Sequence, residues 1–176
     1  MKKEISGVTL ECVQGDIVAQ DDIKAVVNAA NAQLRPGGGV AGAIHRAAGS
    51  ELDQECRPLA PIKPGEAVIT GGHNLPNEHV IHCLGPVYGK DKPEAELLAN
   101  CYRNALRIAE DNNIDSVAFP ALSTGAFGYP MEEAAEVAVK TILEMIPQLK
   151  VVKLIRFVLR GEKDIKIHED AISRLT

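Results

Sequence analysis

The stretch Asn28–Gly49, NAANAQLRPGGGVAGAIHRAAG, is the part of the sequence around which the rest of the chain is arranged. It follows a short apolar run and contains three consecutive glycines, Gly37, Gly38 and Gly39, before an alanine-rich segment. Glycine loses more backbone entropy on folding than any other residue, so three together are expected where the main chain passes close to another group. A helix behind such a loop points free N–H groups and the positive end of its dipole outward. The stretch therefore predicts an anion site that takes a phosphate or diphosphate.

The composition is that of an ordinary globular protein. At 176 residues, with 45% hydrophobic and 24% charged residues, the chain is expected to form a single domain spanning residues 1–176. No apolar run approaches the roughly 20 residues that span a bilayer, and the first residues lack the apolar core of a signal peptide. We therefore expect a cytoplasmic protein without membrane contact, whose four widely spaced cysteines are reduced core residues.

Charge and aromatic content argue against a nucleic-acid partner. The net charge is −5, and the chain has no Trp, three Tyr and three Phe. Readers of nucleic acid rely on a basic surface or on stacking rings, and both are scarce here. No HExxH motif and no Cys/His cluster occurs, and His79 and His82 fall on opposite faces of a strand. We therefore expect no metal and no cofactor.

Strand and helix patterns alternate along most of the chain. Strands are expected over Val8–Gln14, Lys24–Asn28, Glu66–Thr70, His79–Leu84, Ser116–Phe119 and Lys153–Leu159. Helices are expected over Val40–Ala48, Glu51–Arg57, Pro93–Asn112, Met131–Ile146 and Lys163–Leu175. This alternation predicts an α/β sheet with helices on both faces. Ligands bind beyond the carboxyl ends of strands in such sheets, so the loops that follow the strands are expected to meet at one edge.

The segment Gly37–Gly42 also fits the GxGxxG pattern of dinucleotide-binding folds. That motif requires the glycines at the turn directly after a strand, and an acidic residue at the end of the next strand about 20 positions on. Here Ala29–Pro36 separates the strand from the glycines, and a loop, Pro61–Gly65, lies 20 positions on. The dinucleotide fingerprint is therefore rejected, and the phosphate inference stands.

Several polar residues after strands have two interpretations. Asp16 is either a turn cap or an acceptor for the exocyclic amine of a base, and the residues alone favour the cap. Asn28 and Asn31, expected to be exposed at a strand end, suit ribose hydroxyls, although Asx turns would also explain them. The loop Ser123–Gly128 is either an ordinary turn or, with the glycine loop, half of a diphosphate clamp.

Five ordered motifs resemble those of the macro domain, the ADP-ribose-binding module. They are Gln14–Ile17, Val27–Asn31, Gly37–Gly49, His82–Pro86 and Phe119–Gly128. The resemblance covers nearly the whole chain. It implies a three-layer α/β/α sandwich with a mixed, mostly parallel sheet of about six strands.

The resemblance also implies roles for individual residues. Asp16 would bind the adenine amino group, beside the main chain of Ile17, in place of the cap. Asn31 would be the catalytic residue, bound to the distal ribose near the scissile bond. The diphosphate would lie against main-chain amides, and the ring of Phe127 would also cover the distal ribose. The residues of this cradle are Gly38, Gly39, Val40, Ser123, Thr124, Gly125, Ala126 and Phe127.

Two positions depart from the family pattern. In the hydrolytic branch the glycines are commonly followed by Val-Asp-Gly, whereas this chain has Ala41 in place of the carboxylate. Near the last strand many members place an aromatic ring on the adenine, whereas this chain has Leu159, which would make an apolar contact instead.

The expected function is hydrolysis of an ester at the distal ribose. The substrates implied are proteins mono-ADP-ribosylated on Asp or Glu, and O-acetyl-ADP-ribose, with ADP-ribose as the common ligand. One alternative is a non-catalytic reader of ADP-ribose, which Ala41 favours. Another is a phosphatase of ADP-ribose 1″-phosphate, which would use the same pocket.

Overall fold

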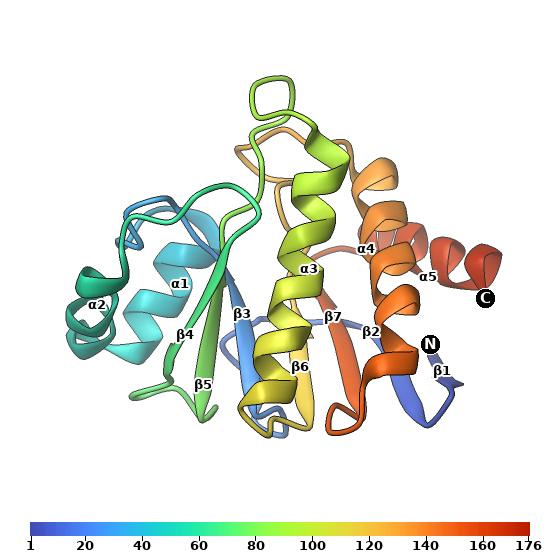
Figure 1. Cartoon of the computed structure of the whole chain (residues 1–176), viewed down its shortest axis with the longest axis horizontal. Helices are drawn as coiled ribbons and strands as arrows, with labels where there is room; N and C mark the ends of the chain where they lie inside the picture. The colour runs from blue at the N-terminus through green and yellow to red at the C-terminus, as the bar shows by residue number, and fades with distance from the viewer.

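A seven-stranded mixed sheet forms the centre of the molecule (Figure 1). The computed structural model describes residues 1–176. The strands are β1 (Lys2–Ile5), β2 (Val8–Gln14), β3 (Ala25–Ala29), β4 (Ala67–Gly71), β5 (His79–Cys83), β6 (Ser116–Phe119) and β7 (Leu154–Leu159), in the order β1-β2-β7-β6-β3-β5-β4. The outer pairs β1–β2 and β4–β5 are antiparallel, and the inner pairs are parallel.

Helices cover both faces of this sheet (Figure 1). They are α1 (Gly39–Ala48), α2 (Ser50–Cys56), α3 (Glu94–Asp111), α4 (Met131–Met145) and α5 (Glu162–Leu175), with short 3₁₀ turns η1 (Arg57–Leu59) and η2 (Ile146–Gln148). Neighbouring strand residues point to opposite faces, so Val27 packs under α3, α4 and α5, while Val26 packs under α1 and α2. The expected three-layer α/β/α architecture is confirmed.

The two faces differ in size and polarity. The face under α3, α4 and α5 holds a cluster of 32 buried apolar residues, and the face under α1 and α2 holds 15. The smaller core shares its face with buried polar side chains, among them Glu11, Asn28 and His82. The larger core therefore supplies most of the hydrophobic stabilisation, and polar contacts concentrate on the other face.

The six strands and five helices expected from the sequence are all present, with no end shifted by more than one residue. The additional strand is β1, which pairs with β2 through a turn at Ser6 and Gly7, both with positive φ (49° and 84°). All four cysteines are buried and free. None of the helices is both long and apolar enough to cross a bilayer.

Candidate functional site

A cavity of about 750 Å³ opens where the loops after β3, β6 and β7 come together. Most residues expected at the ligand line it, and these are Ile17, Asn31, Gly38, Gly39, Val40, Ser123, Thr124, Gly125, Ala126, Phe127 and Leu159. The expectation that loops following separate strands meet at one edge of the sheet is confirmed. The ligand contacts assigned to the individual residues stay predictions.

Two runs of main-chain N–H groups at this cavity have no partner in the protein. None of the N–H groups from Gly37 to Ala41 donates a hydrogen bond to another protein group, and the same holds from Ser123 to Phe127. Both runs line the cavity. Because these N–H groups are not used within the protein and their residues line one cavity, they are available to a ligand rich in acceptors.

The glycine loop can take its shape because it packs directly on the helix that follows. A Cβ atom on Gly42 would lie 2.2 Å from the main-chain oxygen of Gly37, so only glycine lets the loop fold back on α1. Gly39 has a φ of +55°, in the left-handed region that favours glycine. The N-terminus of α1 has Gly38 as its cap residue, without a side-chain cap. Its free N–H groups and dipole therefore face the cavity uncompensated.

Ser123 is strained and partly unsatisfied where it meets the cavity. Its φ is +67°, and its buried Oγ has no hydrogen-bond partner. A Cβ on Gly85 would lie 2.0 Å from this oxygen, so the glycine after β5 makes room for the serine. A non-glycine residue in this conformation is held by its surroundings and commonly marks a functional site.

Asn31 lines the cavity, and its side-chain amide forms hydrogen bonds with the main chain of the same loop. Its Nδ2 donates to the main-chain oxygen of Arg35 (2.8 Å), and its Oδ1 accepts from the Arg35 N–H (3.0 Å). The Arg35 guanidinium in turn contacts Asp53 on α2 at 2.9 Å. Asn31 therefore stabilises its own loop, as the second interpretation expected, but through a residue four positions on and not through the two-residue spacing of an Asx turn. The amide keeps one N–H and one lone pair for a ligand, so both interpretations of Asn31 are compatible.

The expectation that Asn28 is exposed is wrong. β3 runs one residue further than expected, to Ala29, so Asn28 lies inside the sheet and is only 1% exposed. It does not line the cavity. Its side chain faces the smaller core, where the amide contacts His82 on the neighbouring strand, so it is not in a position to meet a ribose hydroxyl directly.

Asn28, Thr70 and His82 form a chain of hydrogen bonds that we call the buried network. Asn28 Nδ2 donates to His82 Nδ1 at 3.0 Å, and His82 Nε2 lies 2.9 Å from Thr70 Oγ1. The amide donor requires an unprotonated Nδ1, so the proton of the neutral ring is on Nε2 and points to Thr70. Burial lowers the pKa of His82 from 6.5 to about 3, with a smaller contribution from His45.

Asp16 forms the turn contact that the residues alone favoured. Its Oδ1 accepts from the N–H of Val18 at 3.1 Å, so the side chain caps the turn. Asp16 itself is exposed and is not part of the cavity wall, whereas its neighbour Ile17 is buried and lines it. The second carboxylate oxygen, Oδ2, accepts no hydrogen bond within the protein.

Three charged residues of the cavity wall were not singled out from the sequence as ligand contacts. They are Arg46 on α1, Arg160 directly after β7 and Asp164 in the first turn of α5. The position of Arg160 at a strand end could have indicated it, since all the parallel strands end at this edge. Ala41 also lines the cavity, so this part of the wall has a methyl group and no carboxylate. No cluster of side chains that could hold a metal ion occurs.

Comparison with known proteins agrees with this geometry. The family model described as the Macro domain matches residues 27–138. A macro domain-containing protein of Chlorobaculum tepidum is 43% identical over 167 residues, covering 94% of this chain and 96% of that protein. The O-acetyl-ADP-ribose deacetylase of Salmonella typhimurium is 46% identical over 164 residues, covering 90% and 91%.

Solved structures share the whole fold. The Oceanobacillus iheyensis macrodomain with ADP superposes with a TM-score of 0.94 at 41% identity, covering 99% of this chain and 95% of that one. The Trypanosoma brucei macrodomain in complex with ADP-ribose gives a TM-score of 0.86 at 33% identity, covering 93% and 68%. The family model, the relatives and the architecture agree, and the chain belongs to the macro domain family.

Proposed function

We propose that this protein binds ADP-ribose and hydrolyses an ester of its distal ribose. The observation that carries the proposal is the pair of unpartnered N–H runs, Gly37–Ala41 and Ser123–Phe127, on the wall of one cavity. A diphosphate supplies enough acceptor oxygens for both runs, and the helix dipole of α1 favours its negative charge. The relatives named for ADP-ribose and for O-acetyl-ADP-ribose deacetylation support the same ligand.

The two ends of the cavity suit the two ends of this ligand. The adenine would lie against the apolar side chains of Ile17 and Leu159, with its amino group at the free oxygen of Asp16. The distal ribose would lie at Asn31, where the spare amide groups suit its hydroxyls. Phe127, from the loop after β6, would cover that ribose.

The proposed chemistry depends on positioning. A water oxygen attacks the acyl carbon, the acyl–oxygen bond breaks, and the ribose oxygen leaves as a hydroxyl after taking up a proton. Asn31 orients the ribose, and the main-chain N–H groups hold the diphosphate so that the water attacks from a fixed direction. Ala41 supplies no base, so an oxygen of the substrate's own diphosphate accepts the proton of the water.

Calorimetry and a hydrolysis assay test this proposal in turn. ADP-ribose titrated into the protein should release or absorb heat with one ligand per chain, and the absence of any heat contradicts the proposed ligand. The protein is then incubated with O-acetyl-ADP-ribose and with a protein mono-ADP-ribosylated on glutamate. Loss of the acyl group or of the modification supports hydrolysis.

A reader function is the second candidate, and Ala41 is the observation that favours it. A reader binds ADP-ribose but leaves both substrates unchanged after prolonged incubation. The variant Ala41→Asp adds a carboxylate to the cavity wall. If the protein is an enzyme, this variant should raise turnover by about tenfold or more. Turnover absent in both proteins, with ADP-ribose binding intact, identifies a reader.

A further inference from the structure

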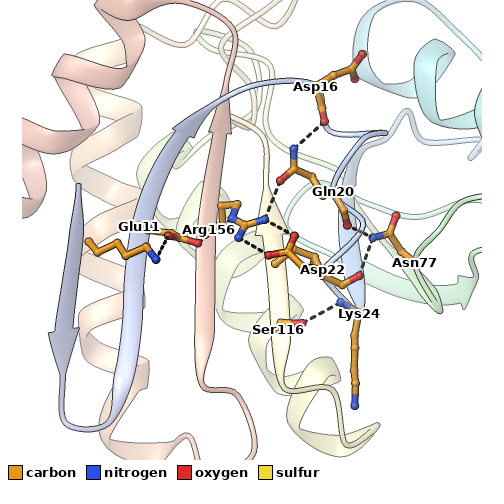
Figure 2. Close-up of polar contacts among 10 residues, drawn as sticks. Glu11, Asp16, Gln20, Asp22, Lys24, Asn77, Ser116 and Arg156 are labelled. Atoms are coloured by element: carbon orange, nitrogen blue, oxygen red, sulfur yellow. Dashed lines mark hydrogen bonds and ion pairs between the residues drawn. The ribbon is translucent and has the colours of Figure 1, made fainter.

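The loop between β2 and β3 is held by an ionic network outside the cavity (Figure 2). We define the ionic network as Glu11, Gln20, Asp22 and Arg156. Arg156 on β7 is at its centre: Nε donates to Glu11 Oε1 (2.8 Å), while Nη1 and Nη2 donate to the two oxygens of Asp22 (2.8 and 2.7 Å). Glu11 and Arg156 are register partners on adjacent strands and face the side of the sheet opposite the larger core.

Gln20 connects this network to Asp16. Its Oε1 accepts from Arg156 Nη1 at 2.9 Å, and its Nε2 donates to the main-chain oxygen of Asp16 at 2.9 Å. A guanidinium group has donors only, so the amide oxygen must face Arg156 and the amide nitrogen must face Asp16. The arginine therefore fixes which way the Gln20 amide points, and this buried side chain has one permitted orientation.

The main chain of the same loop is fixed from a second direction. Asn77 Nδ2 donates to the main-chain oxygens of Gln20 (2.8 Å) and Ile23 (2.7 Å). At the end of the loop, the N–H of Lys24 donates to Ser116 Oγ at 2.8 Å. Figure 2 shows these contacts below Asp16, with Lys24 and Ser116 furthest from it.

These contacts leave Asp16 with one fixed and one available oxygen. Its main-chain oxygen accepts from the N–H of Ala19 and from Gln20, and its Oδ1 accepts from the N–H of Val18. Oδ2 stays an acceptor in a set position next to Ile17, a residue of the cavity wall. An acceptor held in place favours a base that presents an N–H donor and opposes one that presents an oxygen.

We propose that Gln20, oriented by Arg156, is a positioning residue that sets the selectivity of this site for an aminopurine over an oxopurine. The inference deepens the proposed function and rests on it, because it requires the base of the ligand to lie at Asp16. Gln20 touches no part of the ligand and acts by fixing the peptide group and the carboxylate of Asp16. If the network were purely structural, mutating it would lower stability and leave the selectivity between the two bases unchanged.

The test compares two ligands that differ at one group of the base. ADP-ribose carries a 6-amino group, and inosine diphosphate ribose carries an oxygen there. Calorimetry gives two dissociation constants for each protein, and the ratio is the constant for inosine diphosphate ribose divided by that for ADP-ribose. Thermal unfolding is measured alongside. The ratio is insensitive to a general loss of stability, since both ligands use the same diphosphate and ribose contacts.

Gln20→Met removes both hydrogen bonds at similar volume and should lower the ratio about fivefold, the effect of one net hydrogen bond, mainly through weaker ADP-ribose binding. Gln20→Glu keeps the contact with Arg156 but loses the donor to Asp16, so it tests the same step if the first variant does not fold. Ser116→Ala is the matched control, because it releases the other end of the same loop. It should lower stability and leave the ratio unchanged.

The outcomes separate the two proposals. A wild-type protein that binds neither ligand overturns the proposed function, and the inference with it. A wild-type protein that prefers ADP-ribose, with the same preference in both Gln20 variants, overturns the inference alone. A lower ratio in Ser116→Ala, equal to that in the Gln20 variants, also overturns it, since the effect is then general loosening of the loop.

Discussion

The two ends of the cavity rest on polar networks of opposite character. Behind the end proposed for the adenine is the ionic network, built on the charged Arg156, with Asp22 largely exposed to solvent. Behind the ribose end is the buried network of Asn28, Thr70 and His82, which contains no charge while His82 is neutral. The first is held by ion pairs at the edge of the smaller core, and the second by neutral hydrogen bonds within the sheet.

Under the proposed function, this difference would separate recognition of the base from the chemistry at the ribose. The ionic network fixes Asp16, a residue assigned to binding of the base, so changes there should alter affinity. The buried network adjoins Ala29, Ala30 and Asn31, the main-chain segment that reaches the proposed scissile bond. Changes at that end should alter turnover. The predictions below test this division, from the largest expected effect to the smallest.

Asn31→Ala should lower turnover by about 100-fold or more, because misplacing a reacting group by even about 1 Å costs that much. The affinity for ADP-ribose should fall much less, since the diphosphate contacts are unchanged. Steady-state kinetics on O-acetyl-ADP-ribose, with calorimetry, measures both. Asn104→Ala is a matched control, because Asn104 also bonds a main-chain oxygen, that of Gly65 at 2.9 Å, away from the cavity. Equal turnover in Asn31→Ala and wild type refutes the catalytic assignment.

Gly42→Ala should weaken ADP-ribose binding by about tenfold and destabilise the fold by roughly 1–3 kcal/mol. The new methyl carbon would lie 2.2 Å from the oxygen of Gly37 and must push the glycine loop away from α1. Gly161→Ala is the control, since a Cβ there meets nothing within 4 Å. Calorimetry and thermal unfolding measure the two effects. An affinity unchanged by Gly42→Ala would remove the glycine loop from the diphosphate site.

Asp16→Ala should weaken ADP-ribose binding about fivefold by removing one hydrogen bond to the base. Saturating substrate should restore nearly normal kcat, because the change acts at the end remote from the ester. The split between KM and kcat is read from the same kinetics as for Asn31→Ala. A loss of kcat with unchanged KM would contradict the separation between the two ends.

Acid should destabilise the protein through the buried network. The pKa of His82 is about 3 in the folded protein, whereas in the unfolded chain it has its ordinary value of 6.5. Between these two pH values, the unfolded chain binds the proton and the folded protein does not. The contribution of His82 to the free energy of unfolding is therefore complete above pH 6.5 and is lost as the pH falls toward 3. Denaturant unfolding should show a loss of about 1 kcal/mol between pH 6.5 and 5.5.

The variant His82→Asn should reduce this pH dependence. Between pH 6.5 and 5.5 the remainder comes mainly from His45 and His168, whose pKa values burial also lowers. At lower pH, carboxylates whose pKa values are lowered in the fold also contribute, and these are Asp22, Asp53, Glu110 and Glu136. Identical slopes of stability against pH in the variant and the wild type would show that His82 is not the titrating group.

Much of the fold was predictable because local patterns specify it. Apolar runs bounded by glycine and proline gave the inner strands, and apolar stripes gave the long helices. β1 was not predicted, because it has only one apolar residue, Ile5, beside the charged Lys2, Lys3 and Glu4. Charged residues of this kind are typical of edge strands, where they discourage pairing with other chains. The turn Ser6–Gly7 was the available signal.

The cavity wall was predictable only in part. Loops after parallel strands meet by topology, so glycine and hydroxyl residues in those loops could be assigned to one site. Asn28 could not be placed correctly, because a single extra residue in β3 turns an exposed end into a buried position. The ionic network depends on the register between Glu11 and Arg156, which are 145 positions apart, and no local pattern encodes that pairing.

The unpartnered N–H groups at the cavity have a consequence for mutagenesis. Every residue except proline carries the same N–H, so replacing Thr124 by alanine or Ala126 by serine leaves the proposed anion contacts in place. A library of side-chain substitutions would therefore score this part of the wall as tolerant, even though it would hold the most highly charged part of the ligand. Proline scanning, which deletes one N–H at a time, is the genetic tool suited to such a surface.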